Sequence, residues 1–222
     1  MGTRLCLWSP FCKIAAEFRI FQGFERICRV HKKRQRILDT DLTDHFLIAM
    51  PTLDDPHFLH TVTYLCAYSS EGAMGIVINR PLDLELGDVL SHMEINISHP
   101  AAQHIPIFQG GPVQPERGFV IHQPLGNWDA MLKVTPDIGI TTSRDILVAI
   151  ASGKGPDNVL IALGYAGWTA GQLEREMAAN AWLSTPADGS VIFKTPTPKR
   201  WQAAAARLGI DINLLSTQAG HA

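Results

Sequence analysis

The sequence has no long unbroken run of hydrophobic residues. Its apolar stretches are short and are interrupted by glycine, proline, polar or charged residues, whereas a membrane-spanning helix needs about 20 consecutive apolar residues. This excludes a membrane-spanning helix. With 46% hydrophobic residues in 222, the chain is nevertheless long and apolar enough to bury a sizeable core, so we expect a globular protein without a membrane partner.

Cysteine is also scarce where it would be needed to stabilise a fold. Three of the four cysteines lie within residues 1–40, and Cys66 is the only one that follows. A single cysteine cannot form a disulfide within residues 41–222, which favours a packed core and a cytoplasmic location. Cys66 belongs to the apolar strand pattern 61–68, so we predict a buried small hydrophobic residue rather than a nucleophile.

Motifs that would indicate an enzyme are missing as well. No Gly-x-Ser-x-Gly elbow, dinucleotide fingerprint or complete phosphate loop occurs. The segment His57-Phe58-Leu59-His60 has donor side chains but no cysteine partners and no zinc-type spacing, so we predict neither a metal site nor a cofactor. Catalytic residues cannot be nominated by spacing, and the sequence leans against an enzyme without deciding the question.

Charge, by contrast, is abundant at one end. Residues 1–40 contain nine of the 19 basic residues and three of the 21 acidic residues, which leaves a net charge of +6 there and −8 in residues 41–222. We predict a basic N-terminal extension followed by one acidic domain, 41–222. The extension could be a disordered solvated tail, could bind DNA through 26–36, or could result from a spurious upstream start. The acidic domain itself lacks a basic footprint for direct nucleic-acid binding.

From Leu42 onward, short apolar runs alternate with turn residues, as is typical of an α+β fold. Several strands precede the second helix, which argues against a doubly wound parallel sheet. The helix near 170–182 is preceded by Thr169 with Gln172, a capping-box pattern, and Thr142 with Asp145 resembles a second one. The expected strands are 45–50, 61–68, 75–79, 106–109, 118–122, 128–134, 158–164, 191–194 and 210–215, and the expected helices are 85–93, 143–152, 170–182 and 198–208.

A series of local sequences resembles the AlgH/YqgE family over about 180 residues. Its motifs are Phe46-Leu47-Ile48-Ala49-Met50-Pro51, Asp55-Pro56-His57-Phe58, Glu71-Gly72-Ala73-Met74-Gly75, Val77-Ile78-Asn79-Arg80-Pro81, Gly110-Gly111-Pro112-Val113, Arg117-Gly118-Phe119 with His122, Leu163-Gly164-Tyr165-Ala166-Gly167-Trp168, and Gly171-Gln172-Leu173-Glu174 with Asn180, Trp182 and Leu183. The resemblance implies a single domain of coiled, bifurcated, mostly antiparallel β-sheets with flanking helices. Relatives usually begin near Asp44-His45-Phe46, and one branch is labelled a transcriptional regulator of alginate production.

The resemblance also shows one departure, because Tyr68 stands where many relatives have histidine. A catalytic or metal-binding role proposed for that histidine would not transfer to this chain.

We predict an anion site where an apolar strand ending near Gly164 meets the helix after Thr169, since small residues there would expose backbone amides at a helix N-terminus. Each member also has a structural interpretation: Arg80 could pair with Asp83, Glu85 or Asp88, His122 could be a hydrogen-bonded strand residue, and the glycines could serve tight turns. The candidate ligand-binding residues are Asn79, Arg80, Gly110, Gly111, Arg117, His122, Gly164, Tyr165, Gly167 and Trp168.

The first functional hypothesis is a cytoplasmic, non-enzymatic binding or regulatory protein with a small anionic ligand or a protein partner, acting on transcription indirectly. The alternative is a small-molecule hydrolase or transferase with its site near Arg80, Arg117, His122 and Tyr165–Trp168. A second alternative is DNA binding through the basic arm. The sequence does not identify the ligand, the regulated genes or the oligomeric state.

Overall fold

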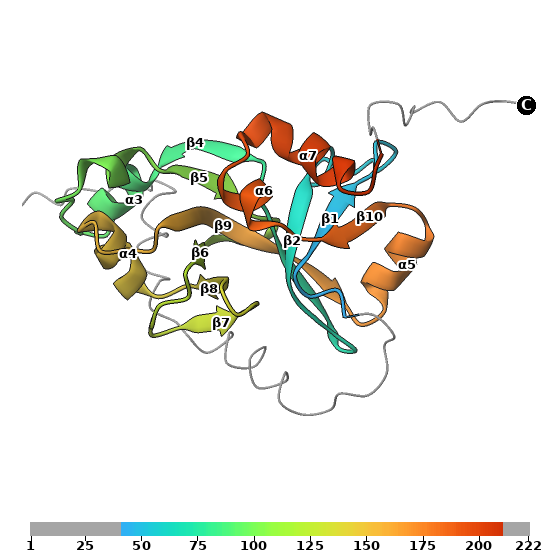
Figure 1. The fold of residues 1–222 in the computed structure, drawn as a ribbon, viewed down its shortest axis with the longest axis horizontal. Helices are drawn as coiled ribbons and strands as arrows, with labels where there is room; N and C mark the ends of the chain where they lie inside the picture. The colour runs from blue at the N-terminus through green and yellow to red at the C-terminus, as the bar shows by residue number, and fades with distance from the viewer. Residues whose placement is uncertain (1–40, 211–222) are drawn as a thin grey trace, which may run out of the picture.

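The computed structural model describes residues 41–210, arranged as one curled sheet with helices on both faces (Figure 1). The predicted extension 1–40, its basic arm and nearly all of the predicted strand 210–215 lie outside the described residues. The helices are α3 (Leu86–His92), α4 (Arg144–Ala151), α5 (Gln172–Ala178), α6 (Gly189–Phe193) and α7 (Arg200–Ala206), with two short 3₁₀ helices, η1 (Pro100–His104) and η2 (Thr197–Lys199).

The strands form a path in the order β10-β1-β2-β3-β9-β6-β8-β7, while β5 joins β9 from the side and carries β4 at its outer edge. All pairs are antiparallel except β5 with β9. The strands are β1 (His45–Ala49), β2 (Val62–Ser69), β3 (Gly72–Val77), β4 (Pro81–Glu85), β5 (Pro106–Gln109), β6 (Val113–Gln123), β7 (Met131–Lys133), β8 (Gly139–Thr141), β9 (Asn158–Thr169) and β10 (Trp182–Pro186).

Strand β9 runs through both halves of the sheet and is the place where the sheet forks. Its first half pairs with β5 on one edge, from Ile107 with Ile161 to Gln109 with Leu163. Its second half pairs instead with β3, and Ala166 lies opposite Gly75. The change of partner falls at Gly164, so the two half-sheets share one continuous strand, as the name bifurcated implies.

The sheet is buried on both faces, which explains why β1 reads as an uninterrupted apolar run. Side chains alternate along β1: Phe46 and Ile48 pack toward α6 and α7, whereas Leu47 packs with Trp168 on the opposite face, where α5 lies. A further cluster joins α3 and α4 to the same sheet near Ile161. Helices therefore enclose each half of the sheet (Figure 1).

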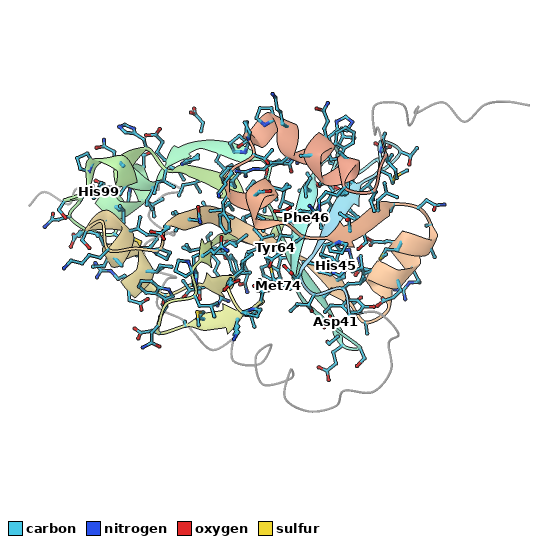
Figure 2. The ribbon with its side chains drawn as sticks, viewed as in Figure 1. Asp41, His45, Phe46, Tyr64, Met74 and His99 are labelled. Carbon is cyan, nitrogen blue, oxygen red and sulfur yellow. The ribbon has the colours of Figure 1, made fainter. Side chains whose placement is uncertain are left out.

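One cluster of the core contains the aromatic pair Phe46 and Tyr64, both labelled in Figure 2. Phe46 and Tyr64 are fully buried with their rings edge to face at 6.2 Å, and the Tyr64 hydroxyl donates to the Asp44 carboxylate at 2.8 Å. Met74 is buried in the same cluster. Cys66 lies beside them with its thiol 3.2 Å from the Tyr64 carbonyl oxygen, and burial raises its thiol pKa, which confirms the buried structural cysteine and disfavours a thiolate nucleophile.

The α+β class and the mostly antiparallel sheet confirm the prediction, but several elements were wrong or missed. Strand β9 continues to Thr169 instead of ending near 164, and residues 191–194 lie largely in helix α6 rather than in a strand. A short apolar run such as Val191-Ile192-Phe193 has no periodicity that separates a buried helix from a strand. Asp188 decides the matter locally, because its side chain accepts from the Ser190 amide and caps α6. Strands β4, β8 and β10 were not predicted.

The predicted helix ends were correct only in part. Gln172 accepts a hydrogen bond from the Thr169 amide at 3.0 Å, although helix α5 itself begins only at Gln172, directly after the turn Ala170-Gly171. At α4 the N-cap is Ser143 rather than Thr142, and its hydroxyl donates to Asp145. The local sequence thus located both helix starts to within about two residues.

Candidate functional site

Three of the candidate glycines, Gly110, Gly111 and Gly164, meet at the fork of the sheet, with their backbones in direct contact. The Gly110 amide donates to the Leu163 carbonyl oxygen at 2.7 Å, and the Val77 amide donates to the Gly110 carbonyl oxygen at 2.8 Å. A Cβ added at Gly110 would lie 2.3 Å from the carbonyl oxygen of Gly164, and one at Gly111 would lie 2.2 Å from the carbonyl carbon of Tyr165. Glycine is therefore required here by backbone packing.

Asn79 and Arg80 hold the loop between β1 and β2. Asn79 accepts from the Val62 amide at 2.8 Å and donates to the His60 carbonyl oxygen at 2.9 Å. The Arg80 guanidinium donates to the carbonyl oxygens of Pro56 at 2.6 Å and Leu59 at 3.1 Å. The alternative interpretation, in which Arg80 pairs with Asp83, Glu85 or Asp88, is replaced by these backbone contacts.

Arg117, Tyr165 and Gly167 lie together on β6 and β9. The Arg117 guanidinium lies over the Phe119 ring, 5.6 Å from its centroid, and donates to the Gln114 amide oxygen at 3.1 Å. Desolvation lowers the pKa of Arg117. The Tyr165 ring lies edge to face with Phe119 at 5.7 Å, and a Cβ at Gly167 would lie 3.3 Å from that tyrosine ring.

Trp168 belongs to a separate aromatic corner beneath α5. Its ring stacks on Phe58 and meets Trp182 edge to face. The indole N–H groups of Trp168 and Trp182 both donate to Oε2 of Glu176, at 2.9 and 2.8 Å. Because the strand continues to Thr169, the predicted strand-to-helix junction at 164–169 was wrong, and α5 has only seven residues.

His122 is fully buried at the other end of β9, where it lies opposite Val159. Its Nδ1 is 3.0 Å from the Pro124 carbonyl oxygen, which fixes the proton on Nδ1, while Nε2 has no hydrogen-bond partner among the described residues. Desolvation lowers the pKa of His122. This arrangement matches the structural interpretation of a hydrogen-bonded histidine.

The ten candidate residues therefore fall into separate neighbourhoods. His122 lies opposite Val159 and Trp168 lies nine residues further along β9, a separation of roughly 30 Å along a strand. The hydrolase or transferase alternative needs Arg80, Arg117, His122 and the aromatic pair around one reacting group, and the fold does not gather them. Ligand binding by any one of these residues remains a prediction.

A cleft within residues 41–210 lies between the sheet and the α6–α7 corner. It has a volume of about 370 Å³, at the lower end of the range for small-ligand sites. Its walls come from the start of β5 with Phe108, the start of β9 with Leu160, and Phe193 of α6. Helices α6 and α7 occupy this side of the sheet in Figure 1.

Arg200, the first residue of α7, supplies the positive charge in this cleft. Its side chain is 7% exposed, and its guanidinium lies over the Phe108 ring, 5.1 Å from the centroid. Nε donates to the Thr195 carbonyl oxygen at 3.0 Å and Nη1 donates to the Ile78 carbonyl oxygen. Within residues 41–210, no carboxylate forms an ion pair with it and Nη2 has no hydrogen-bond acceptor. Desolvation lowers the pKa of Arg200 to about 10.

Arg200 was not among the predicted site residues, although its position in the sequence is unusual for a cation. Lys199 and Arg200 stand at the start of a predicted helix, where the positive end of the helix dipole disfavours cations. An arginine placed against that preference, at the border of an alanine-rich apolar segment, indicates a role outside helix stability. Its proximity to Phe108, 92 positions earlier, could be seen only in the folded chain.

Comparison with known proteins places this fold. The family model described as AlgH-like matches residues 46–213. The chain belongs to the AlgH-like family. Among similar AlgH-like proteins, a UPF0301 protein of Thioalkalivibrio sulfidiphilus is 58% identical over 183 residues, covering 82% of this chain and 98% of that protein. A UPF0301 protein of Nitrosococcus oceani is 55% identical, covering 81% and 96%.

Solved structures agree with the assignment. The solution structure of the AlgH protein from Pseudomonas aeruginosa has a TM-score of 0.69 and 48% sequence identity, covering 85% of this chain and all of that one. A crystal structure of a Corynebacterium diphtheriae protein has a TM-score of 0.61 at 16% identity and shows the fold alone.

Residues 41–210 contain no group of three or more His, Cys, Asp or Glu side chains arranged to hold a metal ion. None of their helices is long and apolar enough to cross a membrane.

Proposed function

We propose that this AlgH-like protein is a non-catalytic binding protein that takes a small anionic ligand into the Arg200 cleft and exerts regulation through a protein partner. The observation that carries the proposal is the environment of Arg200: its buried side chain lines an open cleft and forms no ion pair within residues 41–210. The proposed anion site thus lies at the start of α7, whereas the sequence predicted one at the end of β9.

The physical reason is the cost of an isolated buried charge. Removing a cation from water is unfavourable unless an opposite charge or several acceptors replace the hydration. Two backbone carbonyl oxygens and the face of Phe108 provide part of this compensation. Even with its pKa lowered to about 10, Arg200 is charged at neutral pH. An incoming anion would complete the compensation through charge-assisted bonds of about 1.5–3 kcal/mol each.

A regulatory rather than a DNA-binding role is supported by charge. Residues 41–222 have a net charge of −8, which repels the phosphate backbone and gives no basic surface from which non-specific affinity arises. We therefore propose that a regulatory effect passes through another protein, with the ligand altering the α6–α7 corner that covers the cleft. We propose that this partner is met in the cytoplasm, because residues 41–222 have a single cysteine and need no internal disulfide.

The test is a two-dimensional NMR titration of the full-length protein with sodium acetate and with inorganic phosphate. We expect saturable shifts of the amides of Phe108, Asn158 and Thr197, which line the cleft, and their loss in Arg200→Gln. Arg200→Lys retains the charge without the fork, and Arg175→Gln, on the exposed face of α5, serves as the matched control.

Wild-type shifts confined to other parts of the protein would overturn the proposal without any variant being needed. The same conclusion would follow if folded Arg200→Gln, judged by its dispersed spectrum, responded to the anions as the wild type does.

A further inference from the structure

We infer that the ligand of the Arg200 cleft is a monocarboxylate with an apolar, ring-sized body. The inference rests on the proposed function and adds the chemical class of the ligand. Three properties of the cleft support it: the number of cations, the nature of the walls and the charge near the opening.

The cleft provides one cation. Of its described lining residues, only Arg200 is positively charged, and the nearby Lys199 is exposed and does not line it. A phosphate dianion or a nucleotide is usually held by several cations or by a row of backbone amides, whereas one guanidinium matches the single charge of a carboxylate. Nη2, which has no acceptor in the described chain, is the atom available for that bond.

The remaining walls are mostly apolar. Phe108 lies under the guanidinium, and Ile105, Leu160 and Phe193 also line the cleft. A carboxylate at Arg200 would therefore place the rest of its molecule against hydrocarbon, where burial of apolar area stabilises the complex by about 25 cal/mol per Å². A volume of about 370 Å³ accommodates a ring with a short side chain.

Asp157 restricts the charge of the ligand. It is exposed, lines the same cleft and forms no ion pair within residues 41–210. Its carboxylate would repel a second negative charge on the ligand, although solvent screens the effect because the residue is exposed. The cleft thus combines one attractive charge with a weaker repulsive one, which favours a monoanion over a dianion.

The experiment compares five probes by calorimetry and NMR on the full-length protein: phenylacetate, acetate, phenylacetamide, phenylmalonate and inorganic phosphate. We expect phenylacetate to bind at least about tenfold more tightly than acetate, phenylacetamide and phenylmalonate, where tenfold corresponds to 1.4 kcal/mol. Phe193→Ala should reduce the advantage of phenylacetate over acetate, and Asp157→Asn should narrow the gap between phenylmalonate and phenylacetate.

The outcomes separate the ligand class from the proposed function. If acetate and phosphate shift the cleft amides but phenylacetate binds no more tightly than they do, the inferred class is overturned and anion binding stands. If phenylacetamide matches phenylacetate, the carboxylate contact is refuted. If none of the anions shifts the cleft amides, the proposed function fails together with the inference.

Discussion

Substitution of Gly164 by alanine tests whether the fork glycines are structural. Gly164 has a φ of +73°, and a Cβ there would lie 2.5 Å from the Gly111 carbonyl oxygen. The left-handed conformation costs a residue with a side chain about 1–2 kcal/mol, and forcing an extra carbon into packed backbone costs about 1–3 kcal/mol more. We therefore expect Gly164→Ala to lower the free energy of unfolding by about 2–5 kcal/mol.

The assay is urea denaturation followed by circular dichroism, with the thermal midpoint as a second measure. For a chain of this size, about 1 kcal/mol corresponds to roughly 2–4 °C, so the midpoint should fall by roughly 5–20 °C. The matched control is Gly189→Ala. A Cβ at Gly189 would meet its nearest atom at 3.7 Å, and alanine favours the helix that begins there, so stability should be unchanged or slightly higher.

A loss below about 1 kcal/mol for Gly164→Ala would refute the packing explanation. If stability were retained while anion-induced shifts at residues 164–171 disappeared, Gly164 would instead serve a ligand, as the sequence first indicated.

Three more outcomes are expected. Because the folded pKa of His122 is lowered, its stabilising contribution is present above the unfolded pKa of about 6.5 and is lost as pH falls below it; urea unfolding between pH 7.5 and 5.5 should show this dependence reduced in His122→Gln. Glu176→Ala should lower the free energy of unfolding by about 1–3 kcal/mol in the same assay, since two buried indole N–H groups lose their acceptor, whereas exposed Glu71→Ala should not. Removal of residues 1–40 should leave the cooperative thermal transition intact, and loss of that transition would contradict the predicted domain boundary at 41. The shortened protein should show no salt-sensitive binding to duplex DNA in an anisotropy titration at physiological ionic strength. Such binding would contradict the predicted effect of its net negative charge.

The sequence predicted well where local pattern and tertiary environment agree. The short apolar runs around Phe46 and Tyr64 located β1 and β2, and Cys66 was correctly placed in the core. The prediction was wrong for the segment 163–169, which pairs with different strands along its length. Its glycines resemble a turn, but they mark the point at which the neighbour of β9 changes from β5 to β3. Only long-range pairing keeps that segment extended.

The candidate site was less predictable for the same reason. Arg80 and His122 stand out in the sequence, yet the contacts that occupy them come from Pro56, Leu59 and Pro124 and leave no sequence signature. Arg200 was not predicted, although a cation in the first turn of a helix goes against the preference set by the helix dipole. What makes it unusual is that it is buried and forms no ion pair with any of residues 41–210, and both are properties of the folded chain.

The shared strand β9 limits how this protein can respond to a ligand. A hinge between the half-sheets would have to break the hydrogen bonds that β9 makes on both sides of Gly164, and Gly110 links the same point to Leu163 and Val77. The halves are therefore expected to move as one rigid body, without the clamshell closure of proteins whose lobes are joined by loops. Ligand binding in the Arg200 cleft would instead shift α6 and α7 by a small distance. These helices pack on the sheet but are not part of its backbone hydrogen-bond ladder.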